Sequence, residues 1–212
     1  RAHRRPRGRV PPVDSDEALL ASWRDGDQRA GRALFARHVD RISRFFFSKV
    51  SNGVDDLVQR SFLALLERSR DLPAGVPVRA YLFGIARNLL LRRFRDEYRD
   101  GRHFDELSTS VADLGATPSV LIDKRQQLQV LYAALQALPL DLQITLELFY
   151  WEELPASEIG SVLDLPEGTV RSRLRRARQL LAERLRALGP AIAEPTLADL
   201  ERWARELRDR IG

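Results

Sequence analysis

Residues 155–181 read PASEIGSVLDLPEGTVRSRLRRARQLL, and this stretch decides the fold of the chain. A short helix is expected first, with Ile159, Val162 and Leu163 on its apolar side. Asp164-Leu165-Pro166 forms the turn, and Pro166 suits the first position of the next helix because its missing N–H would be unpaired there anyway. The stretch therefore predicts two helices joined by a tight turn, a helix-turn-helix.

The second helix of this pair separates apolar from basic residues. At 100° per residue, one face collects Val170, Leu174, Ala177 and Leu181. The other face collects Thr169, Ser172, Arg175, Arg176 and Gln179, while Arg171, Arg173 and Arg178 flank the apolar stripe. Residues 141–167 contain no Lys or Arg, whereas residues 171–186 contain seven Arg. A DNA-reading helix needs one face for docking and one basic face for the major groove, although an arginine run also fits a solvated helix face.

Composition narrows the class of protein. The chain has 212 residues, a net charge of +5 and no cysteine, which excludes disulfides and thiolate metal sites. Its three histidines, His3, His38 and His103, show no ligand spacing, so neither a metal nor another cofactor is expected. Lys49 and Lys124 are the only lysines, and the many arginines fit a nucleic-acid partner. Codon bias in a GC-rich genome is the alternative reason for the high arginine content.

No segment resembles a membrane anchor or a secretory signal. No apolar run approaches the roughly 20 residues that span a bilayer. The first 12 residues are basic and proline-rich and lack an apolar core. A cytoplasmic protein without membrane insertion is expected.

Helical periodicity dominates the chain and predicts an all-α fold of two small domains. In the first half, helices are expected from Asp16 to a break near Gly26, over about 28–50, from Val54, and over about 78–98. Residues 101–120 contain Gly, Ser, Thr, Asp and Pro with little periodicity, which is typical of a flexible linker. The predicted divisions are a disordered basic arm at 1–13, a helical domain at 14–100, a linker at 101–122, the helix-turn-helix domain at 123–188, and a C-terminal helical extension at 189–212.

Two stretches of the first half suggest binding surfaces. In Asp55–Leu63, Asp56 and Gln59 offer polar groups beside an apolar row of Leu57, Phe62 and Leu66. That row predicts either a docking face for a partner helix or domain core, and core is favoured for Phe62 and Leu66. The helix from Val78 is rich in arginine, which neutralises phosphates, and contains aromatic residues that can stack on exposed bases. Phe83 and Ile85 are expected in the core instead.

These stretches together resemble the sigma-70 family of RNA polymerase sigma factors, in its small extracytoplasmic-function type. Leu154–Leu185, above all residues 165–178, is similar to region 4, which reads the minus-35 promoter element. Residues 55–63 resemble region 2.2, which binds the clamp helices of the polymerase β′ subunit. Residues 79–89 resemble regions 2.3 and 2.4, which melt and read the minus-10 element. The motifs occur in the family's order and spacing.

The resemblance implies roles for particular residues. Contacts to the minus-35 element are expected from Thr169, Arg171, Ser172, Arg175 and Arg176, with Arg171 placed to one side and within reach of phosphate. Contacts to the minus-10 element are expected from Arg79, Tyr81, Arg87, Asn88, Arg92 and Arg95. Polymerase contacts are expected from Asp55, Asp56, Leu57, Gln59 and Arg60. Loop 71–77 and the start of the following helix are expected to form a pocket for a flipped base.

The implied partners are core RNA polymerase, through its β′ clamp helices and its β subunit, and promoter DNA, with an anti-sigma factor as a further candidate. Two residues depart from the family pattern. Asp164 stands where the family commonly has Gly, a position that Asp tolerates. Arg60 stands where the family usually has an acidic residue, which changes a charge at the expected polymerase interface.

Two other functions fit parts of the sequence. A dimeric regulator would use the same helix-turn-helix on palindromic DNA without polymerase, and a decoy would occupy polymerase without initiating. An enzyme is not expected, because no phosphate loop, nucleophile motif or convergent carboxylate pair occurs, and Glu152-Glu153 is expected in a solvated turn. The C-terminal stripe of Leu197, Leu200, Ala204, Leu207 and Ile211 predicts a helix that packs back on a domain or on a regulator, or else a plain surface helix.

Overall fold

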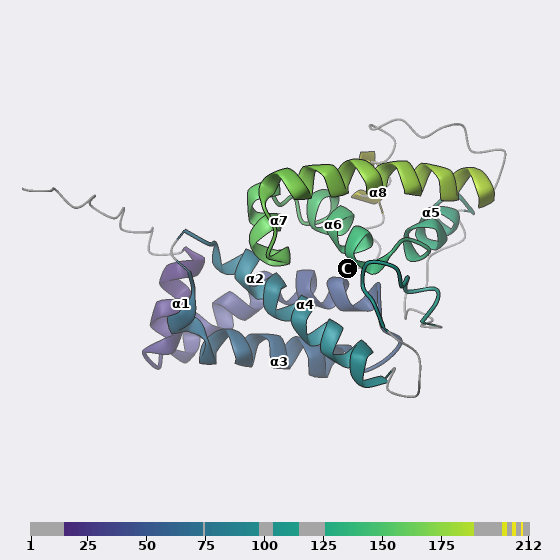
Figure 1. Ribbon diagram of the computed structural model, residues 1–212. Coiled ribbons are helices and arrows are strands. Elements are labelled where there is room, and N and C mark those ends of the chain that lie inside the picture. The colour runs from purple at the N-terminus through teal and green to yellow at the C-terminus, as the bar shows by residue number, and fades with distance from the viewer. Residues whose placement is uncertain are drawn as a thin grey trace, which may run out of the picture.

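The computed structural model describes residues 15–73, 75–97, 104–114 and 126–188, together with 201, 202, 205, 206 and 209. Within these ranges the named elements are all helical, which confirms the all-α fold (Figure 1). They are α1 (Asp16–Arg24), α2 (Gln28–Phe47), α3 (Val54–Glu67), the 3-10 turn η1 (Ser69–Asp71), α4 (Val78–Glu97), α5 (Gln126–Gln136), α6 (Leu140–Tyr150), α7 (Ala156–Leu163) and α8 (Glu167–Leu188). No helix among the described residues is long and apolar enough to cross a bilayer.

Helices α1 to α4 form the first unit, the lower layer of Figure 1. Side-chain caps set where its first two helices begin. Ser15 Oγ accepts a hydrogen bond from the Ala18 amide at 3.2 Å, and Asp27 Oδ1 accepts one from the Arg29 amide at 2.8 Å. The apolar positions predicted for α2 face inward, since Leu34, Ile42 and Phe46 are fully buried. Helix α2 ends at Phe47, three residues before its predicted end.

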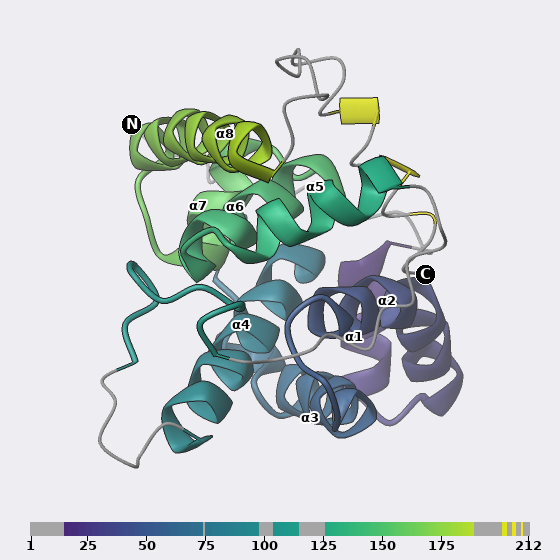
Figure 2. The same ribbon diagram turned by 90° about the vertical axis from the view of Figure 1, so that its right-hand side faces the viewer.

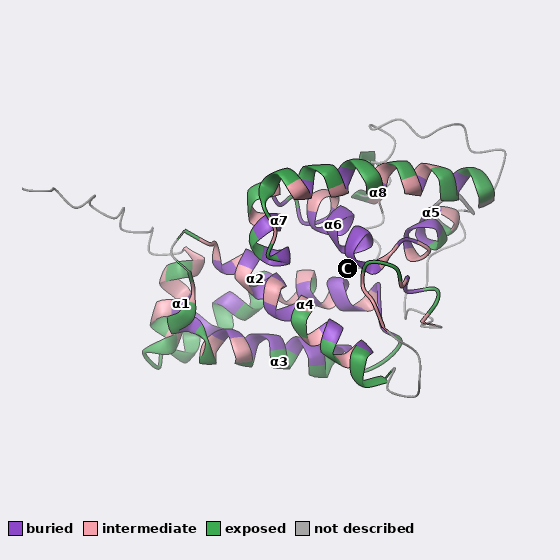
Figure 3. Ribbon diagram, viewed as in Figure 1, coloured by how far each residue is buried: buried purple, intermediate pink, exposed green. Residues whose placement is uncertain are grey.

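Helices α5 to α8 form the second unit, with the 22-residue α8 lying across its outer side (Figures 1 and 2). Helix α6 lies between α8 and the first unit, and Figure 3 shows it buried. All nine residues from Leu140 to Leu148 are buried, including Asp141, Gln143, Thr145 and Glu147. A helix that buries polar residues on all sides needs hydrogen-bond or ionic partners for them.

Residues 104–114, inside the predicted linker, are fixed against the second unit. The amides of Leu140 and Asp141 donate to the carbonyls of Thr109 and Glu106 at 3.0 and 3.2 Å. These amides belong to the first turn of α6, where the helix itself supplies no acceptor. The segment therefore completes the start of α6. The other residues of the predicted linker, 101–103 and 115–122, lie outside the described residues, as do the basic arm at 1–13 and most of the extension at 189–212.

The two units pack directly on each other along a seam between α4 and α7 and between the end of α2 and α6. Their apolar side chains form one continuous core cluster. At the seam, a Cβ built on Gly84 of α4 would lie 3.8 Å from the carbonyl oxygen of Val162 in α7, which is ordinary van der Waals contact.

One prediction is wrong here: Glu152 does not lie in a solvated turn but is 4% exposed, because it pairs with Arg44 of the first unit.

Candidate nucleic-acid interface

The turn between α7 and α8 has the geometry of a tight helix-turn-helix. Asp164 adopts a left-handed conformation with φ 56° and ψ 51°, which ends α7. Asp tolerates that region better than most residues with a side chain. Gly160 is equally necessary, because a Cβ there would lie 2.6 Å from the Leu165 carbonyl oxygen. Sequence reasoning missed this glycine, although a glycine inside a short amphipathic helix already indicates a close approach.

Helix α8 docks by the face that its sequence predicts. Val170, Leu174, Ala177 and Leu181 are all at most 4% exposed. Helix α8 begins at Glu167, so Pro166 precedes its first residue, and the Pro166 carbonyl accepts the amides of Thr169 and Val170 at 2.9 and 3.1 Å. The outward side of α8 is exposed along its length (Figure 3).

The arginines of α8 fall into two groups. Arg173 pairs with buried Asp141 at 3.1 Å, and Arg178 Nε donates to Tyr150 Oη at 2.7 Å. The Arg178 guanidinium also lies over the Phe149 ring, 5.3 Å from its centroid. Burial raises the pKa of Asp141, while the charge of Arg173 acts in the opposite direction. These two arginines anchor α8 to α6, which the helical wheel alone did not reveal.

The residues expected to read the minus-35 element lie on the outward side. Ser172, Arg175 and Arg176 are exposed, and Thr169 is half-buried beside them. Arg171 is exposed too, but its guanidinium is held by Glu167 of the preceding turn at 2.5 Å.

The residues expected to read the minus-10 element are divided between two settings. Asn88, Arg92 and Arg95 are exposed on α4. Arg79 instead pairs with Glu158 of α7 at 3.0 Å, and Arg87 pairs with Glu106 at 2.6 Å. Tyr81 is half-buried, whereas Phe83 and Ile85 lie in the core, as predicted.

The expected polymerase face lies on α3. Asp55, Asp56, Gln59 and Arg60 are exposed, with Arg60 paired to Asp56 at 3.4 Å. Leu57 is only 2% exposed, so its side chain packs in the core and does not reach the surface. Phe62 is likewise core, as predicted, whereas Leu66 is half-buried.

The apolar part of this face comes from residues that the sequence did not single out. Leu63 and Phe35 are 51% and 40% exposed and line a hollow together with Trp23 and Phe62. Leu63 follows Gln59 by one helical turn, so helical spacing from Gln59 is the signal that would have found it.

Comparison with known protein families matches both halves of the chain. Residues 34–100 match the family model described as sigma-70 region 2, and residues 128–181 match that described as sigma-70, region 4. The chain belongs to the sigma-70 family. The sigma-E factor of Haemophilus influenzae, an extracytoplasmic-function sigma factor, is 24% identical over 185 residues, covering 82% of this chain and 97% of that one. The Escherichia coli sigma-E factor is 25% identical over 191 residues, covering 82% and 96%.

Several known structures resemble this sigma factor, among them the following two. CnrH, in complex with the cytosolic domain of CnrY, is 29% identical with a TM-score of 0.60, covering 82% of this chain and 99% of that one. The sigma factor RpoE of Bartonella quintana, in complex with the anti-sigma factor NepR, is 21% identical with a TM-score of 0.50, covering 79% and 92%, and shows the shared fold.

These matches define the function at the level of the family. The protein is a sigma factor of the extracytoplasmic-function type, which directs promoter recognition and transcription initiation by RNA polymerase. It is not an enzyme.

Proposed function

We propose that α8 reads the minus-35 element and α4 the minus-10 element, while the outer face of α3 holds the polymerase. The observation that supports this most is the division of arginines on α8. Arg173 and Arg178 contact Asp141 and Tyr150 of α6. Arg175 and Arg176 are exposed on the outward side of α8. Arginine binds guanine edges and phosphates bidentately, so two exposed arginines on a firmly docked helix suit the major groove.

At the minus-35 element, Ser172, Arg175 and Arg176 would approach base edges, with Thr169 at the start of the helix. Arg171 would contact phosphate, since Glu167 draws it to one side. Each good bidentate contact discriminates against a wrong base by about 1–3 kcal/mol, so two arginines suffice for promoter choice.

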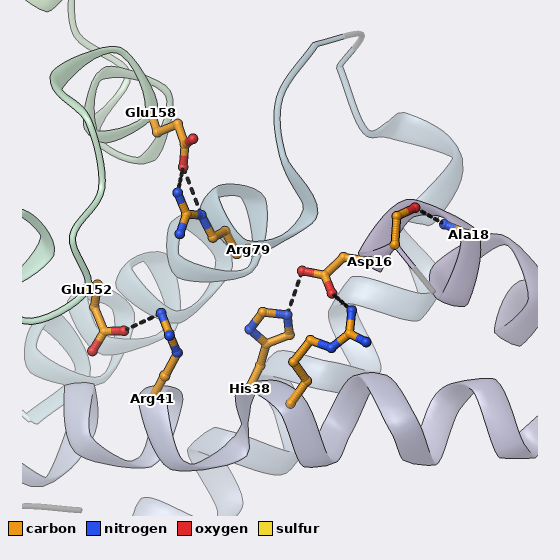
Figure 4. Close-up of polar contacts among 9 residues, drawn as sticks. Asp16, Ala18, His38, Arg41, Arg79, Glu152 and Glu158 are labelled. Atoms are coloured by element: carbon orange, nitrogen blue, oxygen red, sulfur yellow. Dashed lines mark hydrogen bonds and ion pairs between the residues drawn. The ribbon is translucent and has the colours of Figure 1, made fainter. Parts of the chain in front are cut away.

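At the minus-10 element, Asn88, Arg92 and Arg95 are exposed and would contact the melted strand first. Arg79 and Arg87 belong to the same surface in this proposal and would join once Glu158 and Glu106 move away from them (Figure 4 shows the Arg79–Glu158 pair). Half-buried Tyr81 belongs to that surface as well. Loop 71–77 precedes this face, and we keep it as the proposed pocket for a flipped base.

The polymerase face would combine Asp55, Asp56, Gln59 and Arg60 with exposed Leu63. Leu57 supports this face from inside the core. An exposed apolar patch bordered by polar groups is typical of a site that docks a partner helix, and the β′ clamp helices are the proposed partner. The place of action would be the cytoplasm, where RNA polymerase works, and an anti-sigma factor is a proposed regulator.

Transcription assays with core polymerase distinguish the three surfaces, because a variant altered at each surface should be impaired at a different step of initiation. Gln59→Ala together with Leu63→Ala should weaken binding to core polymerase. Arg175→Ala with Arg176→Ala should leave core binding intact and weaken upstream duplex contacts. Asn88→Ala should leave both intact and reduce strand opening, read by permanganate reactivity of unpaired thymines. The assignment is wrong if the α8 variant loses core binding, or if the α3 variant binds core polymerase like the unaltered chain.

A further inference from the structure

The turn before α3 is held by a side chain from another helix. Helices α1 and α2 begin after Ser15 and Asp27, whose side chains accept amides of their own first turns. Helix α3 begins after Gly53, which has no side chain for that purpose. Arg93 of α4 reaches this turn instead. Its Nη1 donates to the Asn52 carbonyl oxygen and its Nη2 to Asn52 Oδ1, each at 2.7 Å.

All three nitrogens of the Arg93 guanidinium donate to residues of this chain. In addition to the two bonds to Asn52, Nε donates to Glu97 Oε1 at 2.7 Å, one turn further along α4. The Arg93 side chain is 20% exposed, whereas that of Arg92 beside it is 74% exposed, with its Nε 4.0 Å from Asp96 Oδ2. A planar guanidinium bound at both ends of its fork keeps one orientation. Arg93 is therefore part of the turn before α3, while Arg92 can reach a phosphate.

Gly53 allows this close approach. Its φ of 69° lies in the left-handed region, which a glycine adopts without steric cost. A Cβ at this position would lie 2.8 Å from Arg93 Nη1, so the guanidinium would have to move away. The bond between Arg93 and the turn therefore depends on the absence of a side chain at Gly53.

The contact is poorly suited to stabilising the fold. A cation at the N-terminus of a helix opposes the helix dipole, and Asp55 and Asp56 in the first turn of α3 offset that repulsion. Glu97 is exposed, and ion pairs at the surface contribute little to stability. What the contact does fix is the position at which α3 leaves the turn.

Arg93 also lies between the two surfaces proposed for the first unit. Helices α3 and α4 lie side by side (Figures 1 and 2). A hollow between them is bordered by Asp56 and Arg60 of the polymerase face and by Arg92 and Arg93 of α4. A residue that joins α4 to the start of α3 at this place fixes one surface relative to the other.

We propose that Arg93 is a positioning residue for the polymerase face, which holds the start of α3 through Asn52 and does not itself contact DNA. The first turn of α3 carries Asp55 and Asp56, and Gln59 follows one turn later, so a shift of the turn moves all three. The proposal rests on the proposed function of α3.

Arg93→Ala and Arg92→Ala form a matched pair, because each removes one arginine from adjacent positions of α4. The chain has no cysteine, so Glu183→Cys places one dye on an exposed position of α8 in every variant. Release of the labelled chain from core polymerase, in the presence of excess unlabelled chain, should be on the order of tenfold faster for Arg93→Ala. It should be unchanged for Arg92→Ala. A release rate for Arg93→Ala equal to that of the unaltered chain would overturn the proposal.

The release rate also distinguishes positioning from a loss of stability. Partial unfolding of the free chain would reduce the amount bound, whereas a misplaced contact surface shortens the lifetime of the complex. Arg93→Ala should therefore hasten release while its thermal midpoint stays close to that of Arg92→Ala.

Gly53→Ala tests the same link from the other side. Its Cβ should displace the guanidinium and hasten release, whereas Gly75→Ala should not, although Gly75 also has a positive φ of 83°, because a Cβ there meets nothing within 4 Å. Gly53→Ala combined with Arg93→Ala should be released no faster than the faster of the two single variants. Multiplied effects would show that the two residues act separately and would overturn the link.

Binding of the holoenzyme to a promoter fragment with an unpaired minus-10 region tests whether Arg93 contacts DNA. Loss of one phosphate contact should reduce the slope of log K against log salt by about 0.7 for Arg92→Ala, and the slope should stay unchanged for Arg93→Ala. An equal reduction in both variants would make Arg93 a DNA contact and overturn the proposal. Unaltered release of the Gln59→Ala, Leu63→Ala variant would instead refute the proposed polymerase face, and with it the role of Arg93.

Discussion

Arg176→Ala tests the reading of α8 most sharply, because a matched control lies on the same helix. Arg176 is exposed and eight residues from exposed Arg184, which places the control about 12 Å further along the axis. Both substitutions remove one positive charge. Asp141 keeps its partner in the Arg176 variant, since Arg173 remains 3.1 Å away, so the fold should not change.

The expected magnitude follows from one lost bidentate contact. About 1–3 kcal/mol of discrimination corresponds to a loss of about 5- to 150-fold in preference for the correct minus-35 base pair. Arg184→Ala should weaken binding slightly and equally for all sequences, because it removes only a distant charge.

The assay is competition transcription with core polymerase on a promoter and on versions with single changes in the minus-35 element. Arg176→Ala should flatten the differences between these templates at one base pair, and Arg184→Ala should preserve them. Identical template rankings for Arg176→Ala and the unaltered chain would refute the assignment of Arg176 to base reading.

Three further predictions concern stability. Leu174→Ala should lower the free energy of unfolding of the second unit by about 2–5 kcal/mol in urea titration, because this docking side chain is 4% exposed; a loss below about 1 kcal/mol would contradict the docking. Asp164→Gly should raise the thermal midpoint and Asp164→Val should lower it, because φ is 56° there; the reverse order would exclude a left-handed turn. Asp16→Asn should cost about 1 kcal/mol at pH 7. Burial alone would raise the pKa of Asp16, but hydrogen bonds from His38 and Arg37 outweigh it and lower the pKa from its usual 3.8, so the stabilisation is present above about pH 4 and disappears as pH falls through the lowered pKa. An equal cost at pH 7 and at pH 2 would contradict this.

The helices and their buried faces could be predicted from the sequence because they depend on the spacing of nearby residues. The stripe on α8 is a property of four residues at helical intervals, and all four are buried. The turn at Asp164 follows from residues next to one another. In both cases the physical cause lies within a few residues of its effect.

The contacts between the two units could not be predicted from the sequence, for the opposite reason. Lys49 and Glu147, which form a buried ion pair, are 98 positions apart in the chain, and a charged residue is normally a solvent-exposed one. The same rule led to the wrong placement of Glu152, because nothing near it in sequence indicates Arg44 as a partner. Arg173 shows the same limit of prediction from local spacing. The helical wheel of α8 places Arg173 beside the apolar stripe, but it cannot distinguish an arginine that contacts phosphate from one that pairs with Asp141.

Transcription of fragmented genomic DNA by core RNA polymerase, with and without this chain, tests the central claim most directly. The account predicts discrete transcripts that appear only when the chain is present, preceded by two shared sequence elements at a constant spacing. Binding of the chain alone to palindromic duplex DNA, with no new transcripts from core polymerase, would contradict it and favour a conventional dimeric regulator.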